Sequence, residues 1–297
     1  MNPIGVIFFK RNIESLRSLE LLTTDLRREC ASLRIFAIDE EGGRVRRLPD
    51  GPYSLPAAKE LATLDEETFT KRVRALGSEL RRLGMTMDIA PVVDIRSGED
   101  HSIVGDRSFS DDPTVITRCA RRYLAALQRE GIAGVIKHFP GHGATTIDSH
   151  KELPRIDCSY EDLASRDLVP YRLLADTASF VMAAHILVPA VDPTFPASLS
   201  REWMRILREE IGFGGFVMSD DLEMHALDSW EPEEKARLCL EAGSDLLLVC
   251  SGREEALLRH WEGVVRAAEA DDTILRRLEQ RREELEETIA AIAGTIR

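Results

Sequence analysis

The stretch Ile132-Ala133-Gly134-Val135-Ile136-Lys137-His138-Phe139 joins an apolar run to a charged and an imidazole side chain. Such a run is typical of a buried strand, and polar groups at its end are delivered to an open edge of the sheet. Pro140 and two nearby glycines disfavour regular structure, so a loop is predicted next. This loop carries Asp148 and His150, an acid–base pair. A buried strand beside such a pair points to an enzyme active site.

Similar apolar runs recur along the chain, and amphipathic helical patterns separate them. The strand candidates are Ile4–Phe9, Arg34–Asp39, Met85–Asp94, Ala133–Phe139, Phe180–Ile186, Gly214–Asp220 and Asp245–Cys250. The helical patterns include Glu66–Leu83, Val115–Glu130, Leu163–Ala175, Glu231–Ala242 and Glu254–Ala268. This alternation predicts an α/β fold whose parallel sheet is covered by helices. No linker rich in Pro, Gly or Ser divides the chain, so a single domain over residues 1–297 is expected.

Polar residues at the strand ends favour a (β/α)8 TIM-like barrel, although the strand count alone also fits an open doubly wound sheet. These residues are Asp39, Asp94, Lys137, His138, His185 and Asp220. In a barrel, the carboxyl ends of the strands converge on one face. Seven strands are one fewer than a closed barrel needs, so an incomplete barrel is predicted. The charged helix predicted over Ile274–Arg297 is expected to pack outside the barrel.

Composition narrows the class of protein. The 297 residues carry a formal charge of −13, which argues against nucleic acid or an anionic membrane as partner. The five cysteines are dispersed without a CxxC pair, so reduced thiols are expected in place of disulfides or a zinc site. No apolar run is long enough for a membrane helix or a signal peptide. A cytoplasmic protein without metal or cofactor is expected.

Two acidic motifs are candidate catalytic groups, and each has an ordinary structural alternative. Asp220 follows a strand and could be a nucleophile or base that Asp221 orients, but the pair could equally cap a helix. Asp148 could hold the tautomer of His150 and raise its basicity, so that His150 acts as an acid and then as a base. The alternative is an unremarkable polar loop.

Other strand ends carry weaker signals. The turn Asp39–Arg47 contains paired glycines and alternating acids and arginines, which can clamp hydroxyl groups or simply form surface ion pairs. Arg107 lies in a second loop of the same kind, and His185 is either functional or a satisfied core histidine. The remaining histidines are expected at the surface, namely His101, His225 and His260.

Together these stretches resemble the N-acetyl-β-glucosaminidases of glycoside hydrolase family 3, particularly the small enzymes of bacterial peptidoglycan recycling. The resemblance runs from Ile4 to Ser251, and its most specific element is Lys137–Gly143 followed by Asp148-Ser149-His150. It implies that Asp220 is the catalytic nucleophile and that His150 and Asp148 form the acid/base dyad. It also implies that N-acetylglucosamine is bound by Asp39, Arg47, Arg107, Lys137 and His138.

The implied reaction is removal of terminal N-acetylglucosamine from muropeptides, with retention, through a covalent glycosyl-aspartate. A monomer or homodimer is expected, with a saccharide as its small-molecule partner. Two departures from the family are visible. Glu40 replaces a Gln that is usual in the turn, and family members generally have another strand and helix before the segment that resembles Ile4–Phe9.

Two other functions remain open on the sequence. The first is a metal-dependent hydrolase that uses His138, His142, His150 and His185, although no HxH or HExxH pair supports it. The second is a non-catalytic sugar-binding protein. We interpret His142 as a structural member of the turn after Phe139.

Overall fold

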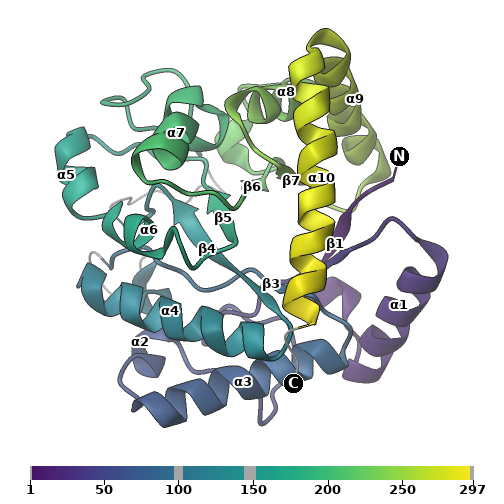
Figure 1. Ribbon diagram of the computed structural model, residues 1–297, viewed down its shortest axis with the longest axis vertical. Coiled ribbons are helices and arrows are strands. Elements are labelled where there is room, and N and C mark those ends of the chain that lie inside the picture. The colour runs from purple at the N-terminus through teal and green to yellow at the C-terminus, as the bar shows by residue number, and fades with distance from the viewer. Residues whose placement is uncertain (1, 97–102, 144–151, 295–297) are drawn as a thin grey trace.

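One parallel sheet organises the molecule (Figure 1). The structure, a computed structural model, describes residues 2–96, 103–143 and 152–294. Within these ranges seven strands lie side by side in chain order. They are β1 (Gly5–Phe8), β2 (Ile35–Ile38), β3 (Met87–Asp88), β4 (Ala133–Phe139), β5 (Phe180–Ala183), β6 (Phe216–Asp221) and β7 (Leu246–Leu248). Every neighbouring pair is parallel, which confirms the predicted α/β fold and all seven strands.

The strand β3 is much shorter than the predicted Met85–Asp94. Only Met87 and Asp88 form the continuous ladder, and an isolated bridge from Val92 to Lys137 continues the pairing further on. Pro91 lies between these two contacts and has no N–H to donate to a neighbouring strand. The proline therefore divides the predicted strand.

Helices follow the strands, as the sequence predicts. They are α1 (Leu16–Glu29), α2 (Ala58–Leu61), α3 (Glu66–Arg82), α4 (Pro113–Arg129), α5 (Tyr160–Ser165), α6 (Val169–Leu174), α7 (Arg201–Arg205), α8 (Pro232–Ala242), α9 (Glu254–Ala270) and α10 (Asp272–Ala293). The single helix predicted over Leu163–Ala175 is wrong, because the chain forms α5 and α6 there. Pro170 lies in the first turn of α6, where its missing N–H costs nothing, whereas inside a longer helix it would break a hydrogen bond.

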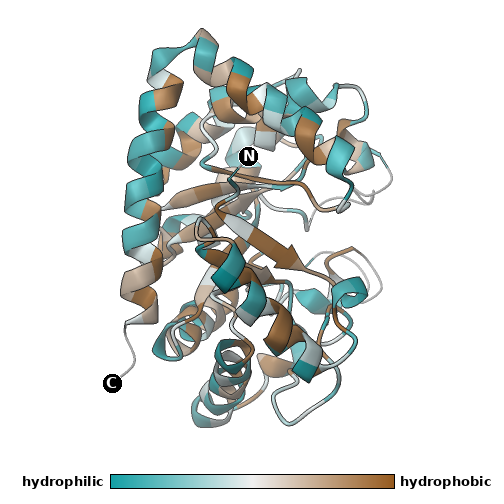
Figure 2. Cartoon of the chain, turned by 90° about the vertical axis from the view of Figure 1, so that its right-hand side faces the viewer, coloured by the Kyte–Doolittle hydropathy of each residue, from teal (hydrophilic) through white to brown (hydrophobic). Residues whose placement is uncertain are grey.

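The two faces of the sheet pack against different partners, as the two-residue repeat of a strand requires. Phe36, Ile38, Val181 and Val217 pack in a cluster with buried residues of α1, α3, α4, α6 and α7. The alternate residues form a second layer inside the curve of the sheet. It contains Ile35, Ala37, Met87, Ala133, Val135, Phe180, Met182, Phe216, Met218 and Leu246. Figure 2 shows these apolar strands between helices whose outer surfaces are hydrophilic.

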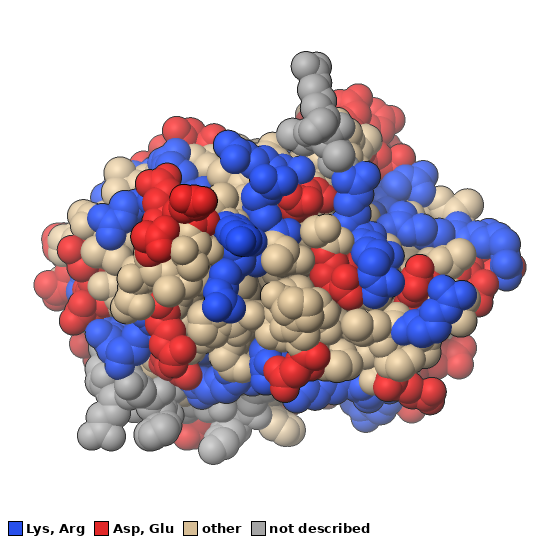
Figure 3. Space-filling model, turned by 90° about the horizontal axis from the view of Figure 1, so that it is seen from below, with Lys and Arg blue, Asp and Glu red and all other residues tan. Residues whose placement is uncertain are grey.

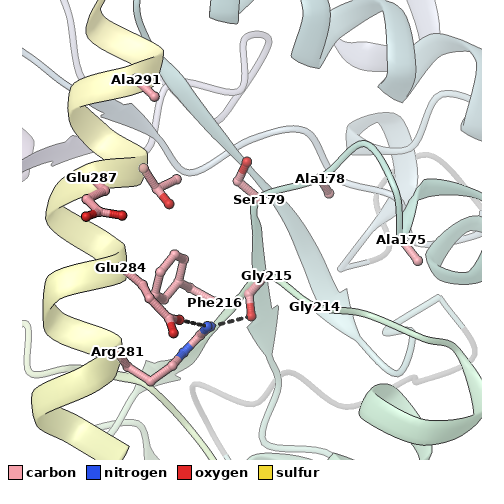
Figure 4. A pocket seen from close by; sticks show the side chains of 11 residues that line it. Ala175, Ala178, Ser179, Gly214, Gly215, Phe216, Arg281, Glu284, Glu287 and Ala291 are labelled. Carbon is pink, nitrogen blue, oxygen red and sulfur yellow. Dashed lines mark hydrogen bonds and ion pairs between the residues drawn. The ribbon is translucent and has the colours of Figure 1, made fainter.

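The C-terminal helix α10 does not pack outside the barrel, which corrects the expectation for Ile274–Arg297. Its residues Leu285, Ile289 and Ile292 belong to the inner layer of the sheet. Arg281 donates to Gly215 O at 2.6 Å (Figure 4). It also donates to Asp245 Oδ1 at 3.0 Å, and both acceptors lie at the amino ends of strands. The helix therefore lies across the amino-terminal end of the sheet. An amphipathic pattern alone does not say which apolar layer a helix will meet.

The sheet does not close into a complete barrel within the described ranges. β1 and β7 are its two edge strands, and each has a ladder partner on one side only. Their carboxyl ends are joined by a side chain, because the Arg11 guanidinium donates to the Cys250 carbonyl. The predicted shortfall of one strand is therefore present in the part of the chain that the structure describes.

The expected surface positions of the histidines are only partly correct. His225 is exposed, whereas His260 is buried and its Nδ1 donates to Ala256 O at 2.8 Å. His260, Gly263 and Ala267 form the buried stripe of α9, and Gly263 approaches the Glu233 carbonyl of α8 closely. His101 lies outside the described residues.

The described surface mixes both signs of charge. On the face seen in Figure 3, basic and acidic side chains are interspersed, with neutral ones between them. Among the helices that the structure describes, none combines the length and the apolar character needed to cross a membrane.

Candidate active site

The carboxyl ends of β2 and β4 meet through charged side chains. Lys137 Nζ of β4 donates to Asp39 Oδ1 at 2.6 Å, and Arg47 Nη2 donates to the other oxygen of Asp39 at 2.6 Å. Lys137 is almost fully buried, whereas Asp39 and Arg47 are partly exposed. Asp39 thus joins two cations at the open edge of the sheet, as the predicted convergence of strand ends requires.

Glu41 extends this network to the loop that carries Arg107. Arg107 binds Glu41 in a bidentate pair, with Nε at 2.8 Å from Oε2 and Nη2 at 2.7 Å from Oε1. Lys137 Nζ lies 2.5 Å from Glu41 Oε1. Burial opposes the ionisation of Glu41, but Arg107 and Lys137 outweigh it and hold its pKa far below the ordinary range. Glu41 is not among the site residues predicted from the sequence.

Asp94 fixes the ring of His138. Its Oδ2 lies 2.6 Å from His138 Nδ1, and its Oδ1 accepts the backbone N–H groups of His138 and His142 at 3.2 and 2.7 Å. The network assigns the Nδ1 proton to the Asp94 side and leaves His138 Nε2 facing Arg107 Nη2 at 3.3 Å. Burial opposes the ionisation of Asp94, but His138 and His142 lower its pKa overall.

Asp220 lies on β6, which continues through Asp221, so the alternative of a helix N-cap at this pair is wrong. Burial opposes the ionisation of Asp220, yet the electrostatic influence of His185 and His138 leaves its pKa below the ordinary value. Asp221 Oδ1 accepts the backbone N–H of Cys250 at 3.1 Å, which ties β6 to the end of β7. Asp221 therefore orients the strand end.

His185 is fully buried beside this strand end. Its Nδ1 lies 2.7 Å from Ser198 Oγ, and its Nε2 lies 2.9 Å from the Asp221 carbonyl oxygen. The histidine is thus satisfied within the core, and it also contacts the main chain that follows Asp220. His142 is buried with its ring edge against His138, consistent with its predicted structural role.

The turn between Asp39 and Arg47 has the geometry that its glycines predict. Gly42 and Gly43 have φ values of 98° and 54°, which residues with a side chain rarely adopt. Glu40 points back into the turn, where its Oε2 accepts the N–H groups of Arg47 and Leu48 at 2.6 and 3.0 Å. Burial raises the pKa of Glu40. The turn holds the backbone of Arg47 beside Asp39.

Comparison with known proteins assigns this arrangement to a family. A family model described as the glycosyl hydrolase family 3 N terminal domain matches residues 2–285. The chain belongs to glycoside hydrolase family 3. A curated relative named β-hexosaminidase, from Nitrosomonas eutropha, is 37% identical over 262 residues, which cover 85% of this chain and 75% of the relative. The resemblance found in the sequence is confirmed, and the chain is a glycosidase by family.

Solved structures of family 3 members have the same fold. A β-N-acetylglucosaminidase from Paenibacillus sp. FPU-7 superimposes with a TM-score of 0.90 at 34% identity, covering 98% of this chain and 57% of its own. This chain therefore spans little more than half the length of that enzyme. NagZ from Neisseria gonorrhoeae, in complex with N-trifluoroacetyl-D-glucosamine, gives a TM-score of 0.77 at 31% identity, covering 98% of this chain and 91% of its own.

The structure brings together six of the eight site residues predicted for this family 3 member. Contacts or electrostatic influence link Asp39, Arg47, Arg107, Lys137, His138 and Asp220. The predicted acid/base dyad, Asp148 and His150, lies outside the described residues. His150 is also one of the four histidines of the alternative metal site. Among the described ranges, no group of three or more His, Cys, Asp or Glu side chains is arranged to hold a metal ion.

One open cavity near the sheet lies away from this site. It has a volume of about 570 Å³ and lies at the amino-terminal end, between α10 and the first residues of β6 (Figure 4). Its lining includes Ser179, Gly214, Gly215, Glu284 and Thr288. Chemistry, and not cavity size, therefore locates the candidate active site.

Proposed function

We propose that this chain is a retaining exo-β-N-acetylglucosaminidase that removes terminal N-acetylglucosamine from peptidoglycan fragments. The observation that carries the proposal is an Asp220 carboxylate with a lowered pKa, at the same edge of the sheet as the Lys137–Asp39–Arg47 network. A carboxylate that stays ionised beside fixed donors can attack a sugar carbon while the donors hold the hydroxyl groups. The glucosamine derivative bound by the Neisseria gonorrhoeae relative supports the sugar class.

In the first step, Asp220 forms a bond to the anomeric carbon as the glycosidic bond breaks. Protonated His150 gives its proton to the departing oxygen, so the leaving group departs as an alcohol. In the second step, neutral His150 takes a proton from water, and the resulting hydroxide releases the sugar from Asp220. Asp148 orients the imidazole throughout. An imidazole in place of the second carboxyl gives an acid whose ordinary pKa is already near neutrality.

The remaining residues bind the sugar. Arg47 keeps its Nη2 on Asp39, and its side chain is partly exposed at the edge of the sheet, where the guanidinium can meet a hydroxyl oxygen. Lys137 and Arg107 are held by carboxylates and can share their remaining N–H groups with hydroxyl oxygens. Asp39 accepts from hydroxyl groups, and His138 holds the Arg107 guanidinium through its Nε2, at 3.3 Å.

We further propose that residues 1–297 act as a single barrel domain in the cytoplasm, as a monomer or homodimer. All five cysteines are free thiols, which fits a reducing compartment. The net charge of −13 and the mixed charges of Figure 3 fit a neutral saccharide better than nucleic acid.

A substrate panel tests the function. Aryl β-N-acetylglucosaminide, β-glucoside and β-xyloside are compared with and without EDTA. We expect hydrolysis of the N-acetylglucosaminide above the other two, unaffected by EDTA, with the β-anomer as first product in NMR. Chelator-sensitive turnover would favour the metal-dependent hydrolase. Saccharide binding without turnover of any substrate would favour the sugar-binding alternative.

A leaving-group series tests the dyad. In His150→Ala, hydrolysis of substrates with poor leaving groups should fall far more than that of activated aryl glycosides, because only the former need a proton in the first step. The exposed His225, which pairs with Asp228 at the surface, offers a matched control as His225→Ala. Equal losses for all leaving groups in His150→Ala would contradict the assignment.

A further inference from the structure

Three consecutive carboxylates follow β2, and they point in alternating directions. Asp39 and Glu41 meet the cations at the edge of the sheet, whereas Glu40 turns back to accept main-chain N–H groups. This alternation is the two-residue repeat of extended backbone. Only Asp39 among the three is both at the site and partly exposed, with 18% of its side chain accessible against 6% for Glu41.

Both oxygens of Glu41 are already occupied. Oε1 lies 2.5 Å from Lys137 Nζ and 2.7 Å from Arg107 Nη2, and Oε2 accepts from Arg107 Nε at 2.8 Å. These bonds cross between separate elements, since Lys137 lies on β4 and Arg107 ends the short 3-10 helix Gly105–Arg107. Glu41 thus connects two cations that no shared element holds together.

We propose that Glu41 is a positioning residue for sugar binding. It holds Arg107 and Lys137 at a fixed separation without touching the substrate itself. The inference rests on the proposed function, because it assigns the two cations to sugar binding. It adds a residue that the predicted sugar-binding residues do not include.

Electrostatics explains why this position needs an anion. Lys137 lies close enough to Arg107 for the guanidinium to disfavour its charge, and Lys137 is buried whereas Arg107 is partly exposed. Without Glu41, Lys137 retains Asp39, but Arg107 loses its bidentate partner. The two like charges then repel, and the guanidinium is free to move away. A displacement of about 1 Å at a binding group can cost roughly a hundredfold in rate.

The same anion maintains the charge of Lys137. Burial lowers the pKa of Lys137, but Asp39 and Glu41 outweigh it and raise the pKa above its ordinary value. The charged groups that face the ammonium are Asp39, Glu41 and Arg107, and Asp220 also feels its charge. Removing Glu41 leaves burial and Arg107 opposed by fewer anions, so Lys137 should lose its proton at a lower pH.

The test compares Glu41→Gln with wild type on aryl β-N-acetylglucosaminide. We expect KM to rise at least tenfold, kcat/KM to fall about a hundredfold, and the alkaline limb of kcat/KM to move to lower pH. The Kd for free N-acetylglucosamine, measured by calorimetry, should rise with KM. Glu130→Gln is the matched control, because Glu130 pairs with Arg74 of α3 at 2.6 Å and lies just before the amino end of β4, away from the charged edge.

A purely structural role for Glu41 predicts a lower Tm with unchanged KM, Kd and pH profile in the folded fraction, and that result would overturn the inference. Should Glu41→Gln not fold, Glu41→Asp decides. This variant keeps the charge but is one methylene shorter, so a raised KM with a wild-type alkaline limb is expected, and a wild-type KM contradicts the inference. Absence of turnover in the wild-type protein would instead refute the proposed function.

Discussion

Both ends of the sheet contain buried charged groups, but these groups bind different partners at the two ends. At the carboxyl end, Lys137 and Arg107 meet the side-chain carboxylates of Asp39 and Glu41. At the amino end, Asp245 binds Arg208 and Arg281, and both guanidinium groups also donate to the Gly215 carbonyl at 2.6 Å. The network at the carboxyl end has N–H groups that a ligand can reach, whereas the arginines at the amino end also bind the main chain.

This difference separates the two duties of a barrel. In (β/α)8 enzymes the carboxyl end carries chemistry and the amino end carries stability. Arg281 and Arg208 satisfy carbonyl groups that strand pairing leaves over, so a ligand could gain little there. The apolar side chains of α10 complete the seal at that end. Substitutions at the two ends should therefore affect different measurements.

The largest effect is expected for Asp220→Asn. Loss of the nucleophile should lower kcat by about 10⁴-fold or more, while the free energy of unfolding changes by no more than about 1 kcal/mol. Turnover of the aryl substrate and urea denaturation measure the two quantities. Wild-type turnover would refute the assignment. A large loss of stability would contradict the separation of catalysis and stability between the two ends of the sheet.

Asp245→Ala tests the opposite end. Its removal leaves Arg208 and Arg281 without their shared anion, which should cost about 3 kcal/mol of unfolding free energy. The KM and kcat of the folded fraction should remain close to wild type, because the change lies at the far end of the strands. Denaturation curves at constant slope, together with kinetics at a temperature well below Tm, check both statements. An altered KM would show that the two ends are coupled.

A smaller effect is expected for Asp88→Asn, which lies beneath the charged edge. Burial raises the pKa of Asp88 well above its ordinary value, while its oxygens accept from Glu40 N and from Tyr123 Oη at 3.0 Å each. A carboxyl with a raised folded pKa contributes stability that is full below its unfolded pKa of about 4 and is lost as pH rises. The neutral amide should therefore stabilise the protein by on the order of 1 kcal/mol at pH 8, and by less at pH 5.

The control for Asp88→Asn is the pH itself, since Tm is measured for both proteins at pH 5 and pH 8. A gain of equal size at the two pH values would mean that the ionisation of Asp88 does not limit stability. A loss at both would mean that the carboxylate, and not its neutral form, is what the core requires.

Much of the fold follows from local sequence. Each strand is a continuous apolar run, and polar residues mark where it leaves the core, so both the sheet and its functional edge were predictable. The positions of three site residues could be predicted for the same reason, namely Asp39, Lys137 and Asp220. The contacts of α10 were not, because its apolar spacing is satisfied equally by the outer helices or by the inner layer. Glu41 was not singled out either, since its partners Arg107 and Lys137 are distant in the sequence and an exposed turn has the same composition.

The position of α10 also decides how the protein could be handled. Because this helix crosses the amino-terminal end of the sheet and its last turn packs there through Ile292, anything attached beyond Gly294 would emerge on the side away from Asp220 and Lys137. A resin, a sensor surface or a fused partner joined at that end would leave the charged edge facing the solution. Attachment through the start of the chain would instead place the linker beside β1, at an open edge of the sheet.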